Sequence, residues 1–120
     1  MYEYTAEVLR VIEGSRVDLD IDLGLDIRVT KRFKLGGVVL PSLRPSNAEF
    51  DTDSERKVLI ETAKTSAAYV RDEIEGKKVR VVTFCDTDDQ YRVVIYYKKG
   101  TGEVCLNDDL VLLNYAKPYE

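Results

Sequence analysis

The stretch that decides the fold is Val17-Asp18-Leu19-Asp20-Ile21-Asp22-Leu23, in which aliphatic and acidic residues alternate without interruption. A period of two places the aliphatic side chains on one face of a strand and the carboxylates on the other. Glu13-Gly14-Ser15 before this stretch and Leu23-Gly24-Leu25-Asp26 after it have the composition of turns. With further strands predicted around residues 6–11 and 27–35, the first third of the chain is expected to form a three-stranded meander.

A long helix is predicted over residues 53–75, after a polar loop at residues 41–50. Thr52 followed by Glu55 fits a capping box, and Gly76 is a typical helix terminator. The apolar residues of this segment recur at helical spacing and are expected to face the sheet: Leu59, Ala63, Ala67, Val70 and Ile74.

The second half of the chain predicts strands at residues 78–84 and 92–97, and a short strand at 104–106. Asn107 is expected to cap a short helix over 107–114. With no repeat or linker, residues 1–120 are expected to form one domain. The order of three strands, a helix and two strands indicates a mainly β (α+β) fold, a five-stranded antiparallel OB-type barrel.

Composition excludes several kinds of chemistry. The chain of 120 residues has no histidine, which removes Ser-His and Cys-His nucleophiles and HExxH zinc sites. Its two cysteines, Cys85 and Cys105, cannot form a four-cysteine zinc site or hold an iron–sulfur cluster. We expect them to be reduced packing residues, and we expect no metal or other cofactor.

The charge and hydropathy of the chain limit the partners that it can bind and the places where it can be located. The net charge of -4 is the wrong sign for a domain that follows phosphates over a broad surface. No apolar run approaches the roughly 18 residues of a membrane span. We therefore expect no membrane contact, and the two widely spaced cysteines, which form no secreted disulfide framework, favour an intracellular location.

Four sequence motifs follow one another along nearly the whole chain. They are Val8-Leu9-Arg10-Val11-Ile12-Glu13-Gly14-Ser15-Arg16-Val17-Asp18; Phe33-Lys34-Leu35-Gly36-Gly37-Val38-Val39-Leu40-Pro41-Ser42; Gly76-Lys77-Lys78-Val79-Arg80-Val81 with Thr87-Asp88 and Tyr91-Arg92; and Leu106-Asn107 with Leu113-Asn114-Tyr115-Ala116. In this order they resemble the motifs of staphylococcal-nuclease-like (thermonuclease) domains. The long hairpin over residues 18–29 is similar to the versions that bacteriophages carry, and this similarity implies a location in the cytoplasm of a host cell or in a virion.

The resemblance implies an active-site pattern from which this chain departs. Active members of the family cut nucleic acid with Ca²⁺, which two aspartates hold while a glutamate activates water. Here Ser15 and Val39 stand at the positions of the metal aspartates, and Ser42 stands at that of the base. Loss of a general base alone costs about 10²–10⁴ in rate, so a catalytically silent site is expected.

The resemblance also implies two phosphate-binding arginines. Lys34 stands at the first of these positions and Arg92 matches the second, while Arg16 replaces a threonine beside the metal site. Lys34 keeps the charge but loses the bidentate fork of a guanidinium. Arg16, Lys34 and Arg92, with Tyr91 for stacking and Arg44 nearby, are the candidate nucleic-acid-binding residues.

Two acidic clusters are candidates for a metal site elsewhere. Asp18, Asp20 and Asp22 form a row that either binds a hydrated cation or faces solvent opposite Lys31 and Arg32, and the second interpretation is favoured. A second cluster lacks the glycine and terminal glutamate of an EF-hand and indicates a polar turn: Asp86, Asp88 and Asp89.

The leading hypothesis is a catalytically inactive nuclease-like domain that binds protein, as a viral structural or assembly protein or an inhibitor of a host factor. A protein partner or a homo-oligomer is expected, because Val39 makes the former cleft apolar. Active relatives continue into a further helix beyond Glu120, so the tail with Tyr115 and Tyr119 is expected to leave apolar surface uncovered. The alternative is a nucleic-acid-binding protein or a weakly active calcium-dependent nuclease.

Overall fold

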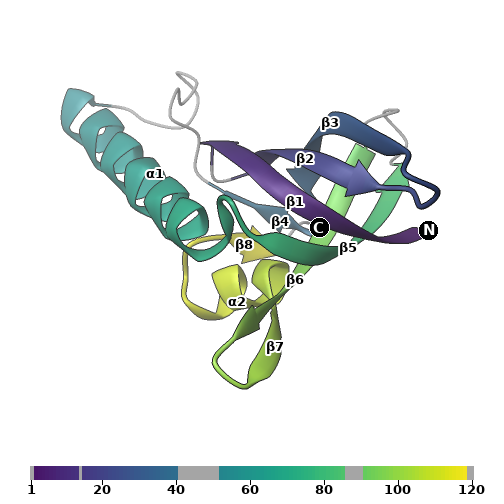
Figure 1. Cartoon of the computed structure of the whole chain (residues 1–120). Helices are drawn as coiled ribbons and strands as arrows, with labels where there is room; N and C mark the ends of the chain where they lie inside the picture. Colours follow the sequence, from purple (N-terminus) through teal and green to yellow (C-terminus); the bar gives the residue numbers. More distant parts are fainter. Residues whose placement is uncertain (1, 14, 41–51, 86–90, 119–120) are drawn as a thin grey trace.

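The computed structural model describes residues 2–13, 15–40, 52–85 and 91–118. Figure 1 shows a strand-rich body with one long helix leaning away from it. The elements in chain order are β1 (Tyr2–Glu13), β2 (Arg16–Asp22), β3 (Arg28–Leu35), β4 (Val38–Val39), α1 (Asp53–Ile74), β5 (Lys78–Cys85), β6 (Tyr91–Lys99), β7 (Gly102–Cys105), α2 (Leu106–Leu112) and β8 (Lys117–Pro118).

A closed barrel of five strands forms the body of the molecule. Strands β3, β2, β1, β5 and β6 pair in that order, and β3 also pairs with β6 and so closes the ring. The predicted five-stranded barrel is confirmed, and its connectivity is compatible with an OB-fold. The prediction that every pair is antiparallel is wrong, because β3 and β6 run parallel. Strand directions cannot alternate all the way around a closed ring with an odd number of strands, so one neighbouring pair must be parallel.

The barrel interior is filled by the alternating aliphatic residues that the sequence predicted. On β2, Val17, Leu19 and Ile21 are buried, while the aspartates between them face outward. On β6, Tyr97 is buried and Tyr96 is only partly covered, as the period of two requires. The removal of this apolar surface from water is the main contribution to the stability of the barrel.

Helix α1 follows its predicted bounds closely. The hydroxyl of Thr52 accepts a hydrogen bond from the Glu55 N–H at 3.1 Å, and Gly76 adopts a φ of +79° after the helix end. Ala63, Ala67, Val70 and Ile74 are buried as predicted. The prediction is wrong for Leu59, which is only partly buried. The N-terminal part of α1 extends beyond the barrel (Figure 1). The apolar stripe of the helix is therefore longer than the surface on which it packs.

The C-terminal region packs against α1 instead of lying open. Tyr115 stacks on Tyr69 with 4.6 Å between ring centres, and the Tyr69 hydroxyl donates to Asp109 at 2.6 Å. Burial, together with this hydrogen bond, raises the pKa of Tyr69. Tyr115 is therefore part of the contact between α1 and α2, contrary to the expectation of an uncovered aromatic tail; Tyr119 lies outside the described residues. Neither described helix is both long and apolar enough to cross a membrane.

Candidate anion-binding site

Three cationic residues lie side by side on adjacent strands of the barrel. Arg16 on β2 is the cross-strand partner of Lys34 on β3, and Lys34 is the partner of Arg92 on β6. Their neighbours in sequence, Val17 and Val93 among them, are buried, so all three side chains belong to the outer face of the barrel. We call Arg16, Lys34 and Arg92 the cationic row. The closing pair of the barrel thus brings together the three predicted residues from distant parts of the sequence.

Two cations of the row, Arg16 and Lys34, have no acidic partner among the described residues. Both residues line a hollow of about 260 Å³ together with Arg32, Phe33 and Tyr91. This part of the surface is therefore locally positive although the whole chain carries a net charge of -4.

The positions that the resemblance assigns to metal ligands hold no carboxylate. The carbonyl of Ser15 accepts a hydrogen bond from the Leu35 N–H at 2.8 Å, which places this turn beside the end of β3. Val39 lies on β4, where it pairs with Lys117 of β8 and is about half exposed. Ser42 and Arg44 lie outside the described residues. The described part of the site therefore offers cations without oxygen ligands that would favour a hard metal ion.

Arginine side chains donate hydrogen bonds to the acidic row on β2. Asp18 accepts from Arg32 at 3.0 Å and from Arg10 at 3.3 Å, and Asp20 accepts from Arg28 at 2.9 Å. The hydrogen bond from Arg32, aided by its charge, holds the pKa of Asp18 below its usual range. We call the Asp18–Arg32 and Asp20–Arg28 pairs the ion-pair ladder.

The ladder confirms the predicted pairing of Asp18 with Arg32, but the prediction is wrong for Lys31. Lys31 stands opposite Leu19, and its Nζ lies 4.1 Å from the centre of the Tyr91 ring. Within the described ranges, no group of three or more acidic or cysteine side chains is arranged to hold a metal ion. The second acidic cluster, at residues 86–89, lies outside those ranges.

Tyr91 lies at the rim of the barrel beside the cationic row. Its ring contacts Phe33 edge-on with 6.3 Å between centres, and Lys31 covers part of its face. The ring remains 45% exposed. A stacking partner has access to part of this ring, but less than the sequence alone suggested.

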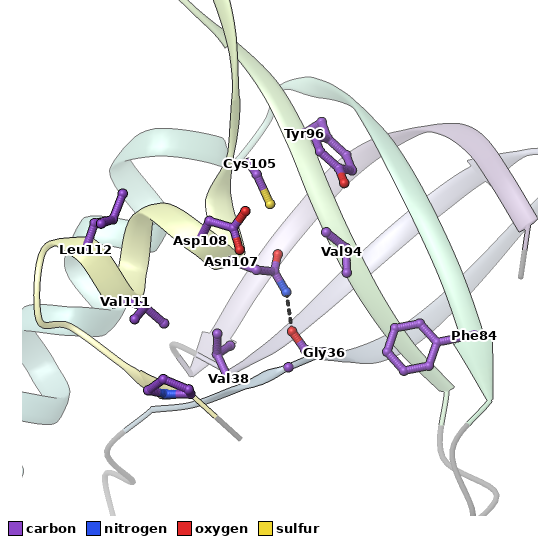
Figure 2. A pocket seen from close by; sticks show the side chains of 12 residues that line it. Gly36, Val38, Phe84, Val94, Tyr96, Cys105, Asn107, Asp108, Val111 and Leu112 are labelled. Atoms are coloured by element: carbon purple, nitrogen blue, oxygen red, sulfur yellow. Dashed lines mark hydrogen bonds between the residues drawn. The ribbon is translucent and has the colours of Figure 1, made fainter. Parts of the chain in front are cut away.

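An apolar groove continues from the cationic row along β6, and the sequence analysis did not identify it. Figure 2 shows Phe84, Val94 and Tyr96 on one side of this groove, with Val38 and Val111 on the other. The groove has a volume of about 640 Å³. Val94 and Tyr96 share the outer face of β6 with Arg92, since they follow it at intervals of two residues.

Gly36 shapes the junction between the row and the groove. A Cβ atom at this position would lie 2.5 Å from Cζ of Phe84, so a larger residue would displace the Phe84 ring. Glycine therefore allows an aromatic ring to pack directly on the backbone where β3 leaves the barrel.

Asn107 fastens α2 to the barrel at the base of the groove. Its amide nitrogen donates to the carbonyls of Gly36 at 2.7 Å and Val93 at 3.2 Å, and its oxygen accepts from the Ile95 N–H at 3.1 Å. The prediction that Asn107 caps α2 is wrong, because the N-cap is Cys105. The Asn107 side chain instead bridges the backbone of β6 and the Gly36 carbonyl just after β3. This role depends on backbone groups from three distant segments, which local sequence does not reveal.

The two cysteines are not paired with each other. Cys85 is exposed at the end of β5, and Cys105 is half-buried at the groove. Burial raises the pKa of Cys105, which makes it a poor nucleophile.

Neither a protein-family model nor a curated protein sequence matches the chain. The resemblance to staphylococcal-nuclease-like domains therefore stays a prediction that rests on the motifs and on the compatible barrel.

Proposed function

We propose that this chain is a nuclease-like barrel that binds single-stranded nucleic acid without cleaving it. The observation that carries the proposal is the register that aligns Arg16, Lys34 and Arg92 across three adjacent strands. Neighbouring strands lie about 4.8 Å apart, so the row presents its cations over a span of about 10 Å. Backbone phosphates of one strand are the ligands that such a spacing suits.

The residue replacements favour binding over catalysis. In the pattern implied by the resemblance, carboxylates beside the phosphate-binding cations hold a metal ion. With Ser15 and Val39 in their place, the positive charges of Arg16 and Lys34 face phosphate oxygens without a metal ion between them. This local charge outweighs the argument from net charge, because phosphate contacts depend on the potential at the groove.

The adjoining apolar groove supports a single strand over a duplex. Phe84 and Tyr96 are aromatic and only partly buried at its wall. Base faces stack on such rings with about 1–3 kcal/mol per base. The bases of a duplex are already stacked on one another and would leave this groove unused.

Fluorescence anisotropy with a labelled single-stranded oligonucleotide tests the proposal. The triple variant Arg16→Gln, Lys34→Gln, Arg92→Gln should lose binding at about 50 mM salt. Lys57→Gln, an exposed cation on α1, is the matched control and should bind like the wild type. With Ca²⁺ added, the oligonucleotide should remain intact. Binding that survives in the triple variant, or Ca²⁺-dependent cleavage, would contradict the proposal.

Protein binding is the second candidate function. A specific observation favours it: exposed apolar side chains gather at the β2–β3 turn, where Leu25 is 94% exposed. Roles in viral assembly or in the inhibition of a host factor remain predictions from the sequence.

A further inference from the structure

Tyr96 lines a second hollow of the surface as well as the apolar groove. This hollow has a volume of about 640 Å³ and lies where β5 and β6 separate. The two strands pair as far as Arg80 and Tyr96, beyond which β5 continues beside β1 and β6 continues beside β7. The charged residues that line the hollow all belong to the described ranges: Lys77, Lys78, Arg80, Lys98 and Glu103.

Three exposed lysines of this hollow form no ion pair within the described part of the chain: Lys77, Lys78 and Lys98. We call them the lysine cluster. Lys78 stands opposite Glu7 on β1, yet these two side chains are not among the ion pairs of the described residues. The one carboxylate in the described lining of the hollow is that of Glu103. This end of β6 is therefore a second locally positive surface.

Arg80 braces the ring of Tyr96 and also occupies the Glu103 carboxylate. Its guanidinium lies 4.2 Å from the centre of the ring. It donates to both carboxylate oxygens of Glu103, at 2.5 and 3.4 Å, and to Glu3 at 3.0 Å. Glu103 stands opposite Lys98, so its bonds to Arg80 leave the charge of Lys98 open to another anion. A ring that is already held loses little freedom when a base stacks on it.

The outer face of β6 connects the lysine cluster to the cationic row. Arg92, Val94, Tyr96 and Lys98 follow one another on this face at intervals of two residues. Six residues of strand rise by about 3.3 Å each, so Arg92 and Lys98 lie about 20 Å apart along β6. Phosphates of stacked nucleotides follow one another about 3.4 Å apart along one strand. The track therefore suits about six stacked nucleotides, within the range of about 4–16 for an OB-fold.

We propose that the lysine cluster is a second phosphate-binding site, and that a single strand runs along β6 from the cationic row, past Tyr96, to this cluster. The inference rests on the proposed function and extends its site. The row holds one end of the strand, a base stacks on Tyr96, and the cluster binds phosphates of a strand that the row already holds. Binding at both ends raises the affinity because the second contact is intramolecular.

The test compares labelled oligothymidylates of four and ten nucleotides by fluorescence anisotropy at about 50 mM salt, with a chelator present. Only the longer strand can reach both sites, so the wild type should bind it about a hundredfold more tightly than the shorter strand. The double variant Lys78→Gln, Lys98→Gln should lower this ratio at least about tenfold. It should also flatten the log–log salt slope of the longer strand by about 1.4, which is two contacts at about 0.7 each.

Two further variants make the comparison specific. The matched control Lys57→Gln, Lys64→Gln removes two exposed lysines of α1 and should keep the wild-type ratio. Tyr96→Leu should lower the ratio, because it removes a stacking surface worth about 1–3 kcal/mol per base. Tyr96→Phe retains an aromatic ring and should preserve the ratio.

The outcomes separate this inference from the proposed function. A ratio below about tenfold in the wild type, or one that is unchanged in the lysine variant, would overturn the inference while the binding of the shorter strand still supports the cationic row. Tighter binding of a ten-residue polyglutamate than of the longer oligonucleotide would overturn it in favour of an acidic protein segment. If neither oligonucleotide binds, the proposed function fails and the inference fails with it.

Discussion

On β2 and β3 the cationic row and the ion-pair ladder lie two residues apart, and the row continues onto β6. The two regions nevertheless differ in what they can bind. In the ladder, Asp18 and Asp20 accept hydrogen bonds from Arg32 and Arg28. In the row, Arg16 and Lys34 are neighbours of one another and form no ion pair within the described chain. The comparison teaches that cations on a strand become a binding site only where their charge is left uncompensated.

The largest effect is expected from breaking the register that assembles the row. Asn107→Leu removes three hydrogen bonds and leaves two buried backbone groups without these partners, the Gly36 carbonyl and the Ile95 N–H, while the Val93 carbonyl still accepts from the Gly36 N–H. We expect a loss of about 3 kcal/mol in the free energy of unfolding, measured with urea, because each buried unpaired group costs about 1–3 kcal/mol.

Asn114 provides the matched control for that experiment. It adopts a φ of +63° and is exposed, so Asn114→Gly should change the free energy of unfolding by less than about 0.5 kcal/mol. A loss below about 1 kcal/mol in Asn107→Leu would show that the barrel closes without this side chain.

The next effect separates the row from the ladder directly. Lys34→Gln should weaken oligonucleotide binding about tenfold, while Arg28→Gln should change it less than about twofold. The reason is that Lys34 has no competing carboxylate among the described residues, whereas Arg28 is held by Asp20 at 2.9 Å. Equal losses in an anisotropy titration would mean that both regions bind the ligand.

A smaller effect is expected when the ladder is converted toward the row. Asp18→Asn removes the negative charge that faces Arg10 and Arg32. Binding of the oligonucleotide should tighten about two- to threefold, since the freed guanidinium of Arg32 adds positive charge beside Lys34. Weaker binding in this variant would contradict the role assigned to the ladder.

The smallest effect is the pH dependence of the ladder. Because Arg32 lowers the pKa of Asp18 from its ordinary 3.8, the stabilisation is present above that ordinary value and is lost as pH falls through the lowered one. The wild type should exceed Asp18→Asn in unfolding free energy by less than about 1 kcal/mol near pH 6. That difference should shrink as the pH falls below 3.8, and a difference that grows on acidification would reverse the sign of the argument.

Local patterns in the sequence were sufficient for most of the fold. The alternation on β2, the capping residues of α1 and the apolar spacing of its C-terminal half each depend on neighbours a few residues away. The errors concern long-range geometry: the parallel pair of β3 and β6, the overhang that leaves Leu59 half-covered, and the bridging role of Asn107.

The candidate site was predictable only in part, for the same reason. Motif matching singled out Arg16, Lys34 and Arg92, but only the barrel closure sets them side by side. The groove along β6 depends on where β3 ends and on how α2 packs against the barrel. No single stretch of sequence encodes that property.

The salt dependence of binding without metal tests the central claim most directly. With a chelator present, the affinity for a single-stranded oligonucleotide should fall with salt along a log–log slope of about -2, since three phosphate contacts on a single strand contribute about 0.7 each. Affinity that requires a divalent cation, or that shows no salt dependence, would contradict the account of a cationic row that binds phosphates by itself.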